Sequence, residues 1–433
     1  MLTPEAGGDV QTAWVLGAAA TPFRKWPERD FRSLTEEAVE GALADAGLAD
    51  GRAVDAVWFG NCAMHLWGQG NLRGQHALAP MVASGRLRGP APIVNVEGGC
   101  ATGSLALHAA VNAVRAGDTD LALAIGVEKT VVPDDPAKMF AIFAGGIEQL
   151  HPEEWQAFFA KQAAQHGQTF APSASRVMFL DIHALQARHH MARYGTTLEQ
   201  IAVGASKNHH HGSLNPAAQY RFTVTPEAAL ADRLVVDPLT RAMCAPMSDG
   251  AAAVLVCSDR LLADRDPAVR DRALRIRACA LAGGRYRDLD APSLTRYASA
   301  KAWKQAGCGP ADVQIVELHD ATSWCEIHHL EQLGLVPVGE GGPFVGSRAT
   351  ALGGELPVNL SGGLVSKGHP LAATGLGMIT ELTEQLRGEA GERQGMHNGS
   401  PPTLGLAHNA GGAIGWDEAL CAVTVLERTS APT

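Results

Sequence analysis

The chain has 433 residues, of which 46% are hydrophobic and 18% are charged, and its formal net charge is −10. This length predicts more than one domain, and this composition excludes an intrinsically disordered chain. The acidic balance disfavours non-specific nucleic-acid binding, which needs a basic surface, and no apolar run approaches the length of a membrane span.

The chain ends and the cysteines indicate a cytoplasmic protein. Residues 1–15 lack the basic-then-apolar order of a signal peptide, and the last residues carry no peroxisomal signal. The eight cysteines are scattered and form no CxxC pair. We therefore expect free thiols in a reducing compartment and predict no metal site.

Short runs of β-branched and apolar residues alternate with helical stretches along the chain. In chain order, strands are predicted over residues 14–19, 56–59, 93–96, 121–125, 252–257, 274–281, 313–318, 403–407 and 420–426. Helices are predicted over 33–46, 102–116 and 371–386, each followed within two residues by a glycine that can end it. Ser33 is the expected N-cap of the first helix, with Glu36 completing a capping box. This alternation predicts βαβ units in a layered α/β fold.

Two passages share an N-x-x-G-G pattern between a predicted strand and a helix. The first runs from Asn95 to Cys100, and the second runs from Asn359 through a Gly-rich loop to His369. A five-residue match can arise by chance, but the shared structural context favours two related halves. The predicted halves comprise residues 1–128 with 241–265, and residues 266–433.

Residues 129–240 fit neither half and are predicted to form an inserted cap over the loops of the site. The segment contains Trp155, Phe158 and Phe159, which are typical of a small core but would also suit the wall of a pocket for an apolar or aromatic group. A run of three histidines at 209–211 could bind a metal ion. Because no further spaced ligands accompany it, we interpret the run as a solvated loop.

Cys100 stands at the junction of a buried strand and a helix, directly after Gly98 and Gly99. A thiol at a helix N-terminus feels the positive end of the helix dipole and unpaired N–H groups, which favour the thiolate. The same N–H groups can bind an oxyanion, and the glycines let a substrate approach the backbone. Cys100 is therefore a candidate nucleophile, and the alternative is a buried structural cysteine.

His369 lies between Gly368 and Pro370 at the start of a predicted helix. These neighbours hold the imidazole on a fixed turn, where it can take the proton of a nearby thiol. The alternative is a helix-entry histidine bonded to the backbone. The loop is Gly-rich, but it lacks the P-loop pattern of a phosphate site.

Two further polar pairs follow apolar strands. His319 and Asp320 come after one predicted strand, and His408 and Asn409 come after another. Polar residues at such strand ends face the cleft where active sites of layered α/β folds form. His319 could donate a hydrogen bond to a thioester oxygen, whereas Asp320 could orient a neighbouring group or form a structural ion pair.

Together these motifs resemble the thiolase superfamily, and most of all its SCP2-thiolase branch, over nearly the whole chain. The segments that carry the resemblance are Gly99 to Gly103 (nucleophile loop), Gly368 to Gly375 (GHPxGATG loop), Asp237 to Leu239 with Ser248 to Ala252, His319 with Asp320 (HDxF motif) and His408 with Asn409 (HNxG loop). The resemblance implies a thiolase-like layered α-β-α-β-α fold built from two duplicated halves, with an inserted cap or loop domain.

The resemblance also implies a mechanism. Cys100, deprotonated by His369, attacks an acyl-CoA and forms an acyl-enzyme. A second thioester or thiol then exchanges with the acyl-enzyme, making or breaking a carbon–carbon bond. His319 and the backbone amides of Cys100 and of Gly411 or Gly412 would stabilise the oxyanions. His408 would stand in for a second catalytic thiol, with Asp320 and Asn409 as supporting residues.

The ligands and partners follow from the same resemblance. Acyl-CoA and coenzyme A are the expected substrate and product, with no permanently bound cofactor. Candidate contacts for coenzyme A are Arg221, Ser248 and Ser366. Thiolases are at least dimers, so a homodimer or homotetramer is expected. Some relatives work with a small zinc-ribbon and OB-fold partner protein, which is a possible partner here.

One motif departs from the family pattern. Where members of the SCP2 branch often carry HDCF, this chain has Ala321 and Thr322 after the His-Asp pair. Cys325 is the nearest thiol, but we expect it one helical turn too late, so His408 or a water would serve instead. Thiolytic cleavage of a 3-ketoacyl-CoA, or the reverse condensation, remains the first interpretation. Acyl transfer to a non-CoA acceptor, retro-aldol cleavage and a non-catalytic subunit of a complex are the alternatives.

Overall fold

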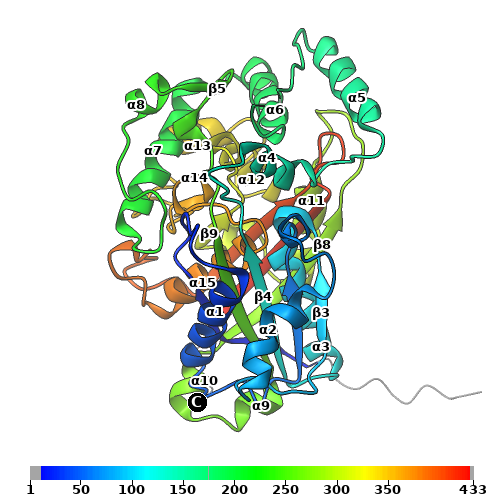
Figure 1. The fold of residues 1–433 in the computed structure, drawn as a ribbon. Coiled ribbons are helices and arrows are strands. Elements are labelled where there is room, and N and C mark those ends of the chain that lie inside the picture. The colour runs from blue at the N-terminus through cyan, green and yellow to red at the C-terminus, as the bar shows by residue number, and fades with distance from the viewer. Residues whose placement is uncertain (1–10, 174, 430–433) are drawn as a thin grey trace, which may run out of the picture.

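The computed structural model describes residues 11–173 and 175–429, which are built around one mixed nine-stranded sheet (Figure 1). The strands in chain order are β1 (Ala13–Ala20), β2 (Ala56–Gly60), β3 (Ile93–Val96), β4 (Leu121–Glu128), β5 (Leu234–Val236), β6 (Leu239–Thr240), β7 (Gly250–Ser258), β8 (Leu274–Gly283), β9 (Ile315–Leu318), β10 (Leu404–Gly411) and β11 (Leu420–Arg428). The strand order in the large sheet is β3-β2-β4-β7-β1-β8-β11-β10-β9, and β5 and β6 form a separate small sheet.

Helices cover both faces of the large sheet. They are α1 (Phe31–Asp45), α2 (Arg73–Ala83), α3 (Thr102–Ala116), α4 (Pro136–Ala144), α5 (Pro152–Gln165), α6 (Phe179–Tyr194), α7 (Leu198–Leu214), α8 (Pro226–Ala231), α9 (Asp259–Ala263), α10 (Pro267–Arg272), α11 (Leu294–Ala306), α12 (Ser323–Leu333), α13 (Gly341–Gly346), α14 (Gly363–Lys367) and α15 (Thr374–Arg387). Among the described residues, no helix combines the length and apolarity needed to cross a bilayer.

The two halves of the sheet repeat one topology. In the first half, β2 is parallel to β3 and β4, and β7 is antiparallel to β4 and β1. In the second half, β9 is parallel to β10 and bridges Val358 in parallel, and β11 is antiparallel to β10 and β8. The halves join through the antiparallel pair β1 and β8. The repeated pattern around Asn95 and Asn359 therefore corresponds to a duplicated unit.

Two helices from the two halves meet in the middle layer. α3 packs on β4 and β2, α15 packs on β10 and β7, and the two helices contact each other. Their apolar faces share one buried cluster that includes Leu107, Val111, Leu376 and Leu382. α1 covers the outer face of the first half and α11 that of the second. The expected layered α-β-α-β-α fold is confirmed.

Of the elements found, β5, β6 and all α-helices other than α1, α3 and α15 were not predicted. For the predicted elements, most boundaries lie within three residues of those observed, with two corrections. α3 covers the predicted residues 102–116 and ends at Gly117, whose φ of +79° suits glycine. The predicted N-cap of α1 was wrong, because Asp30 caps the helix by accepting the Ser33 N–H at 2.8 Å. The second correction concerns β10, which continues through Gly411 and carries His408 inside the strand.

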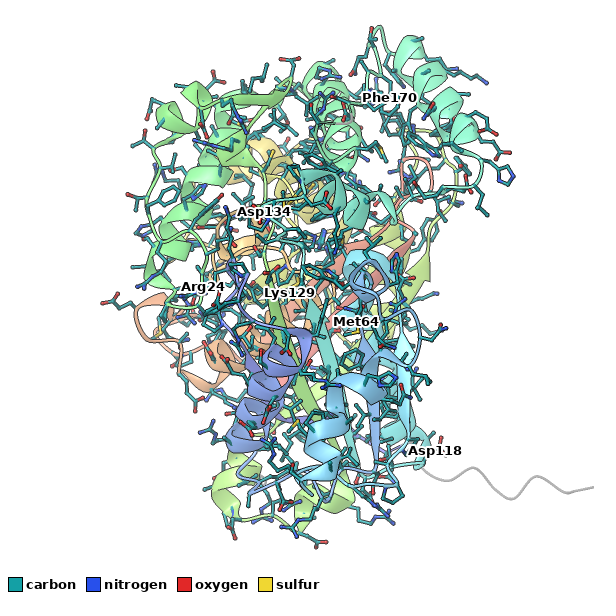
Figure 2. All side chains as sticks on the ribbon, in the orientation of Figure 1. Arg24, Met64, Asp118, Lys129, Asp134 and Phe170 are labelled. Atoms are coloured by element: carbon teal, nitrogen blue, oxygen red, sulfur yellow. The ribbon has the colours of Figure 1, made fainter. Side chains whose placement is uncertain are left out.

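The segment between β4 and β7 contains helices α4 to α8, and α5 to α8 lie together at one end of the molecule (Figure 1). Trp155 and Phe159 are buried there in a small core with Trp416, and Phe158 packs against it. Phe170, which packs on the same core, lies near the top of the view in Figure 2. These aromatic residues therefore act as core residues of the segment.

The run of histidines at 209–211 is not the solvated loop that we predicted, because α7 continues through it to Leu214. His209 and His211 are each 1% exposed. The His211 ring lies 3.0 Å from the carbonyl oxygen of Asn359, and its other nitrogen accepts the Leu352 N–H at 3.0 Å. These two histidines are buried packing residues of the helix.

Candidate active site

Cys100 lies in a single turn of 3-10 helix, Gly99–Ala101, directly before α3. Gly99 has a φ of +57°, and a Cβ there would lie 2.8 Å from the backbone nitrogen of Gly412. A Cβ on Gly411 would lie 2.4 Å from the backbone nitrogen of Cys100. Only glycines let the end of β10 approach the Cys100 turn this closely. Their backbone N–H groups are thereby brought next to the thiol.

Small residues also bring the two middle helices together at their N-termini. A Cβ on Gly103 of α3 would lie 2.5 Å from the Ala372 carbonyl oxygen, and one on Gly375 of α15 would lie 2.1 Å from the Ser104 hydroxyl. Because Cys100 precedes α3 and His369 precedes α15, this close packing places the two side chains at one point.

His369 is fixed by hydrogen bonds on both its backbone and its ring. Its N–H donates to the Ser248 hydroxyl at 3.1 Å, and its Nδ1 lies 2.8 Å from the Thr374 hydroxyl. Thr374 donates its only hydroxyl proton to the Pro370 carbonyl at 3.0 Å. It must therefore accept a hydrogen bond from His369 Nδ1–H, which leaves Nε2 as the unprotonated nitrogen.

His319 is fixed in the opposite tautomer. The amide of Asn409 donates to His319 Nδ1 at 3.0 Å, while its oxygen accepts the Ser104 hydroxyl proton at 2.9 Å. With Nδ1 as an acceptor, the proton of the neutral ring sits on Nε2. His319 therefore offers a donor and His369 offers an acceptor.

The Cys100 sulfur and one ring nitrogen each of His319 and His369 lie within 4.8 Å of one another. The two rings are 5.0 Å apart between centroids and almost perpendicular. Burial raises the pKa of Cys100 to about 12, opposed by the backbone N–H groups of Gly412 and Cys100, and lowers the pKa of His369 to about 3. The resting pair is thus a neutral thiol and a neutral imidazole. Cysteine and histidine are also residue types that bind zinc, and no metal site was predicted here from the sequence.

This cluster lines a cavity of about 260 Å³. Apolar side chains of the inserted segment, among them Phe140, Phe143 and Phe179, form part of its wall. A second cavity of about 230 Å³ reaches Cys100 from the side of Glu97. Cys100 therefore lines two cavities, and residues of the segment between β4 and β7 form part of the wall of both.

Asp320 connects the two loops of the second half. It is fully buried, and its carboxylate accepts the Leu364 N–H and the Asn208 side-chain amide, both at 2.7 Å. These bonds tie the end of β9, which carries His319, to the start of α14. Burial raises the pKa of Asp320 well above its usual range. Asp320 thus positions the backbone that leads to His369.

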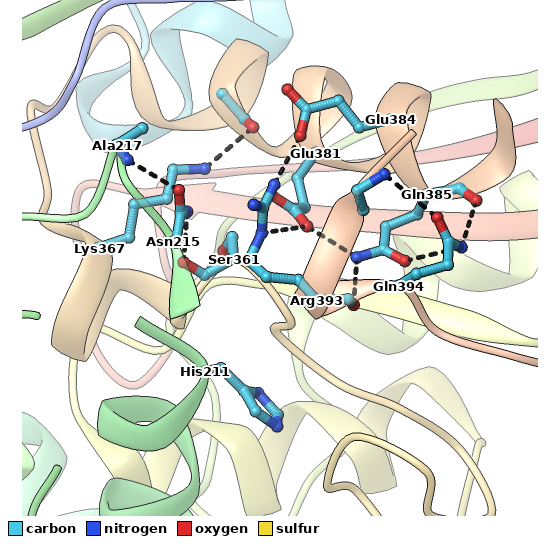
Figure 3. A network of polar contacts seen from close by, with 12 residues as sticks. His211, Asn215, Ala217, Ser361, Lys367, Glu381, Glu384, Gln385, Arg393 and Gln394 are labelled. Carbon is cyan, nitrogen blue, oxygen red and sulfur yellow. Dashed lines mark hydrogen bonds and ion pairs between the residues drawn. The ribbon is translucent and has the colours of Figure 1, made fainter. Parts of the chain in front are cut away.

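A buried ionic network holds the same region from the other side (Figure 3). Arg393 pairs with Glu381 at 3.1 Å and with Glu384 at 2.6 Å, both on α15. Lys367, two residues before His369, donates to the Gly377 carbonyl at 3.0 Å. The Lys367 bond therefore spans the turn that carries His369, and the Arg393 pairs fix the C-terminal part of α15.

His408 is placed differently from our expectation. It is fully buried, lies 3.0 Å from the Thr295 hydroxyl through Nε2, and packs against the His329 ring at 4.2 Å between centroids. Side chains alternate along a strand, so His408 points away from the face on which Asn409 meets His319. Ala410, Gly411 and Gly412 line the cavity, but His408 is not among the described residues that line it.

The three residues expected to bind coenzyme A are also placed differently. The Ser248 hydroxyl accepts the His369 N–H and donates to the Pro246 carbonyl, and the Ser366 hydroxyl donates to the Tyr220 carbonyl at 2.9 Å. Both hydroxyls therefore hold loops of the site. Arg221 is exposed, and the arginines that line the cavity are Arg176 and Arg233.

Besides Ser175 and the two arginines, the cavity is lined by four polar residues that sequence reasoning did not assign to it: Cys325, His183, His329 and Glu418. α12 begins at Ser323, so Cys325 lies in its first turn and reaches the cavity instead of falling beyond it. Its spacing of four from His329 places both on one helix face, a signal that could have been read. His183 and Glu418 come from distant segments and carry no local signal.

Comparison with known proteins agrees with this geometry. The family pattern "Thiolase, N-terminal domain" matches residues 13–233, and "Thiolase C-terminal domain-like" matches residues 283–424. An acetyl-CoA acetyltransferase of Methanothermobacter thermautotrophicus is 37% identical over 93% of this chain and 96% of its own length. Sterol carrier protein 2 of Bos taurus is 33% identical over 88% of this chain and 67% of its own length.

Solved structures share the fold. An Ltp2-ChsH2(DUF35) aldolase superposes with a TM-score of 0.73 at 23% identity, covering 97% of this chain and 99% of that one. Human mitochondrial 3-ketoacyl-CoA thiolase in complex with CoA superposes with a TM-score of 0.65 at 16% identity, covering 97% of this chain and 99% of that one. The chain is therefore a member of the thiolase superfamily and is related to the SCP2-type thiolases, as an enzyme of the acyl-transfer class.

Proposed function

We propose that the chain cleaves a 3-ketoacyl-CoA by thiolysis, or runs the reverse Claisen condensation, through an acyl-enzyme on Cys100. The observation that carries this proposal is the meeting of the Cys100 sulfur with His319 and His369 within 4.8 Å on the wall of one cavity. Membership of the thiolase superfamily supports the acyl-transfer class.

In the first step, His369 Nε2 takes the proton of Cys100, and the thiolate attacks the 3-keto carbon. The bond between C2 and C3 of the substrate breaks, and its electron pair passes to the departing acetyl-CoA enolate, which takes up a proton at C2. The thiol of free coenzyme A then attacks the acyl-enzyme, releases the shortened acyl-CoA and returns the proton to Cys100. Because the resting thiol and imidazole are neutral, we expect proton transfer to accompany the attack.

Oxyanions formed in these steps need fixed donors. His319 supplies Nε2–H, since Asn409 occupies its Nδ1. The backbone N–H groups of Cys100 and Gly412, which already oppose the rise of the thiol's pKa, supply a second set. Such preorganised donors are worth more inside a closed cavity than in water.

Cys325 is our candidate for the group that moves the proton at C2. It lines the cavity that Cys100 lines, whereas His408 lies behind the strand. Its Sγ is 3.3 Å from the Thr322 hydroxyl, which would orient the thiol. We therefore propose Cys325, in place of His408, for the role of the second catalytic thiol.

Coenzyme A would enter beside the inserted segment 129–240, which we propose as the cap domain. Arg233 is exposed and lines the cavity, and no ion pair to it is found among the described residues. Its guanidinium could therefore meet the phosphates of coenzyme A. Arg176, in contrast, pairs with Asp181 at 2.5 Å.

We propose a homodimer formed through β3, one of the two edge strands of the sheet; the other, β9, is bridged by Val358. Val94 on this strand is 44% exposed, and an uncovered apolar edge strand favours pairing with another chain. A small zinc-ribbon and OB-fold protein is a further candidate partner. The fold-sharing Ltp2-ChsH2(DUF35) aldolase is named for two components, which supports a partner protein here.

The decisive experiment is intact-protein mass spectrometry after incubation with acyl-CoAs. We expect the wild type and the control Cys308→Ala to gain an acyl adduct that free coenzyme A removes, and Cys100→Ala to gain none. An adduct that free coenzyme A does not remove would favour a non-CoA acceptor. If the wild type binds coenzyme A but forms no adduct, the proposal is wrong, and retro-aldol chemistry or a partner-dependent subunit becomes the better assignment.

A further inference from the structure

Part of the cavity wall is polar, although the proposed acylation uses no group there. His183, His329 and Glu418 come from α6, α12 and the connection between β10 and β11, and they line the same cavity as Cys100. A cavity for a plain alkyl chain would be lined by apolar side chains, because hydrocarbon offers nothing to hydrogen-bond.

Both histidines of this wall have a ring nitrogen without a hydrogen-bond partner among the described residues. His329 is 1% exposed, and its Nε2 lies 3.8 Å from the Glu418 carboxylate, too far for a hydrogen bond. Nδ1 of His329 and Nδ1 of His183 have no hydrogen-bond partner among the described residues. Leaving buried polar groups unpaired is unfavourable, so an acyl group that pairs with them gains affinity over one that does not.

The charges of this wall favour a neutral ligand group. Burial lowers the pKa of His329 well below its usual range, with neighbouring histidines adding to the effect, so the imidazole is neutral. Burial raises the pKa of Glu418 to about 7, so its carboxyl can donate as well as accept. Of the two arginines at the cavity, Arg176 is paired with Asp181 and Arg233 is exposed. The buried Arg287, whose charge acts on Glu418, is already paired with Asp417 at 2.6 Å. A carboxylate on the acyl chain would therefore meet Glu418 without an unpaired buried cation among the described residues to offset it.

We propose that His183, His329 and Glu418 form a subsite for a hydroxyl group carried by the acyl chain. The substrates would then be hydroxylated acyl-CoA thioesters. A hydroxyl donates one hydrogen bond and accepts others, which matches a wall that offers imidazole nitrogens and a carboxyl group. This inference rests on the proposed function, because it specifies the acyl group that occupies the same cavity.

The test is ligand binding to the Cys100→Ala protein, which cannot form an acyl-enzyme. Isothermal titration calorimetry would compare ω-hydroxyacyl-CoAs of four, six and eight carbons with plain acyl-CoAs of equal length and with the matching ω-carboxyacyl-CoAs. We expect the hydroxylated ligand of the best length to bind at least about tenfold more tightly than its plain counterpart. The carboxylated ligand should gain nothing.

Variants of the polar wall residues test whether these residues cause the preference for the hydroxylated ligand. Adding Glu418→Leu or His329→Leu to the Cys100→Ala protein removes a hydrogen-bonding group and should reduce the preference to within about twofold. The exposed controls Glu340→Leu and His210→Leu should keep it. Equal binding of hydroxylated and plain ligands at every length, or a preference that survives both wall variants, would overturn the subsite. Tighter binding of the carboxylated ligand would also overturn it. If hydroxylated ligands bind more tightly but the wild type forms no acyl adduct, only the proposed function is wrong. If no thioester binds at all, both the proposed function and the hydroxyl subsite are wrong.

Discussion

At the scale of single residues, the two histidines beside Cys100 carry their protons on different ring nitrogens, Nδ1 in His369 and Nε2 in His319. Replacing each histidine should therefore affect a different step. His369→Ala should lower acylation of Cys100 about 10²- to 10⁴-fold and also slow its alkylation by iodoacetamide, because both reactions need the thiol proton removed. His319→Ala should lower acylation about 10²- to 10³-fold but leave alkylation within about threefold, because alkylation forms no oxyanion. Rates of adduct formation by mass spectrometry check both.

The exposed His210→Ala serves as the control for this comparison. Equal losses of alkylation in the two active-site variants would contradict the division of roles between His319 and His369.

Glu128, at the end of β4, predicts a pH dependence of stability. The side chain is fully buried, and burial raises its pKa to about 7, with the N–H groups of Cys62 and Ala63 opposing the rise. The folded state therefore holds the proton more tightly than the unfolded state, whose value is near 4.5. The stabilisation is fully present below pH 4.5 and is lost as the pH rises through about 7.

For this carboxyl the loss is at most about 3 kcal/mol. Glu128→Gln cannot ionise, so its melting temperature should fall less than that of the wild type between pH 5 and pH 8. Part of the fall should remain, because burial also raises the pKa values of Glu317 and Glu418 to about 7. Calorimetric melting at both pH values, with the exposed Glu340→Gln as control, measures the difference. An unchanged pH dependence in Glu128→Gln would contradict the prediction.

At the scale of elements, the site depends on the close approach of α3, β4 and α15. A Cβ on Gly126 of β4 would lie 1.9 Å from the Ala372 carbonyl oxygen, just before α15. Gly126→Ala should therefore destabilise the fold by about 1–3 kcal/mol and displace the turn that carries His369. Both the melting temperature and the rate of Cys100 acylation should fall.

Gly283→Ala is the matched control for this element, because a Cβ at that position on β8 meets nothing within 4 Å. If both variants melted at the same temperature, the tight contact between β4 and α15 would not be a determinant of stability.

At the scale of the whole molecule, the β3 edge predicts the assembly. In the proposed homodimer, Val94 of one copy would face the same strand of the other. Val94→Lys should place like charges against each other and weaken the dimer at least about tenfold. Sedimentation velocity over a range of concentrations measures this, with Val338→Lys, at another exposed apolar position, as control. A Val94→Lys protein that remains as dimeric as the wild type would exclude β3 as the interface.

Much of the fold followed from local patterns in the chain. The nine strands of the large sheet and α3 lie where apolar runs and terminal glycines predicted them, because these signals act within one element. The short strands β5 and β6 were not predicted. The nucleophile turn at Cys100 and the turn at His369 were also predictable, since each is a short glycine-bounded loop at a helix start. The N-cap of α1 was misassigned because Asp and Ser are both favourable N-cap residues. Asp30 is the cap because its backbone is extended and its side chain accepts the Ser33 N–H.

By itself, then, the sequence determined the duplicated α/β architecture, the family and the three residues that meet at the cavity. The face of β10 on which His408 lies was visible only in the tertiary structure. β10 extends through His408 and Asn409, and successive side chains of a strand point to opposite faces, so these two residues cannot both face the site. Only the tertiary structure brought Cys325, His329 and Glu418 to the cavity of Cys100. Contacts between segments so far apart depend on strand register and on the packing of α3 against α15, and no local pattern in the chain records these.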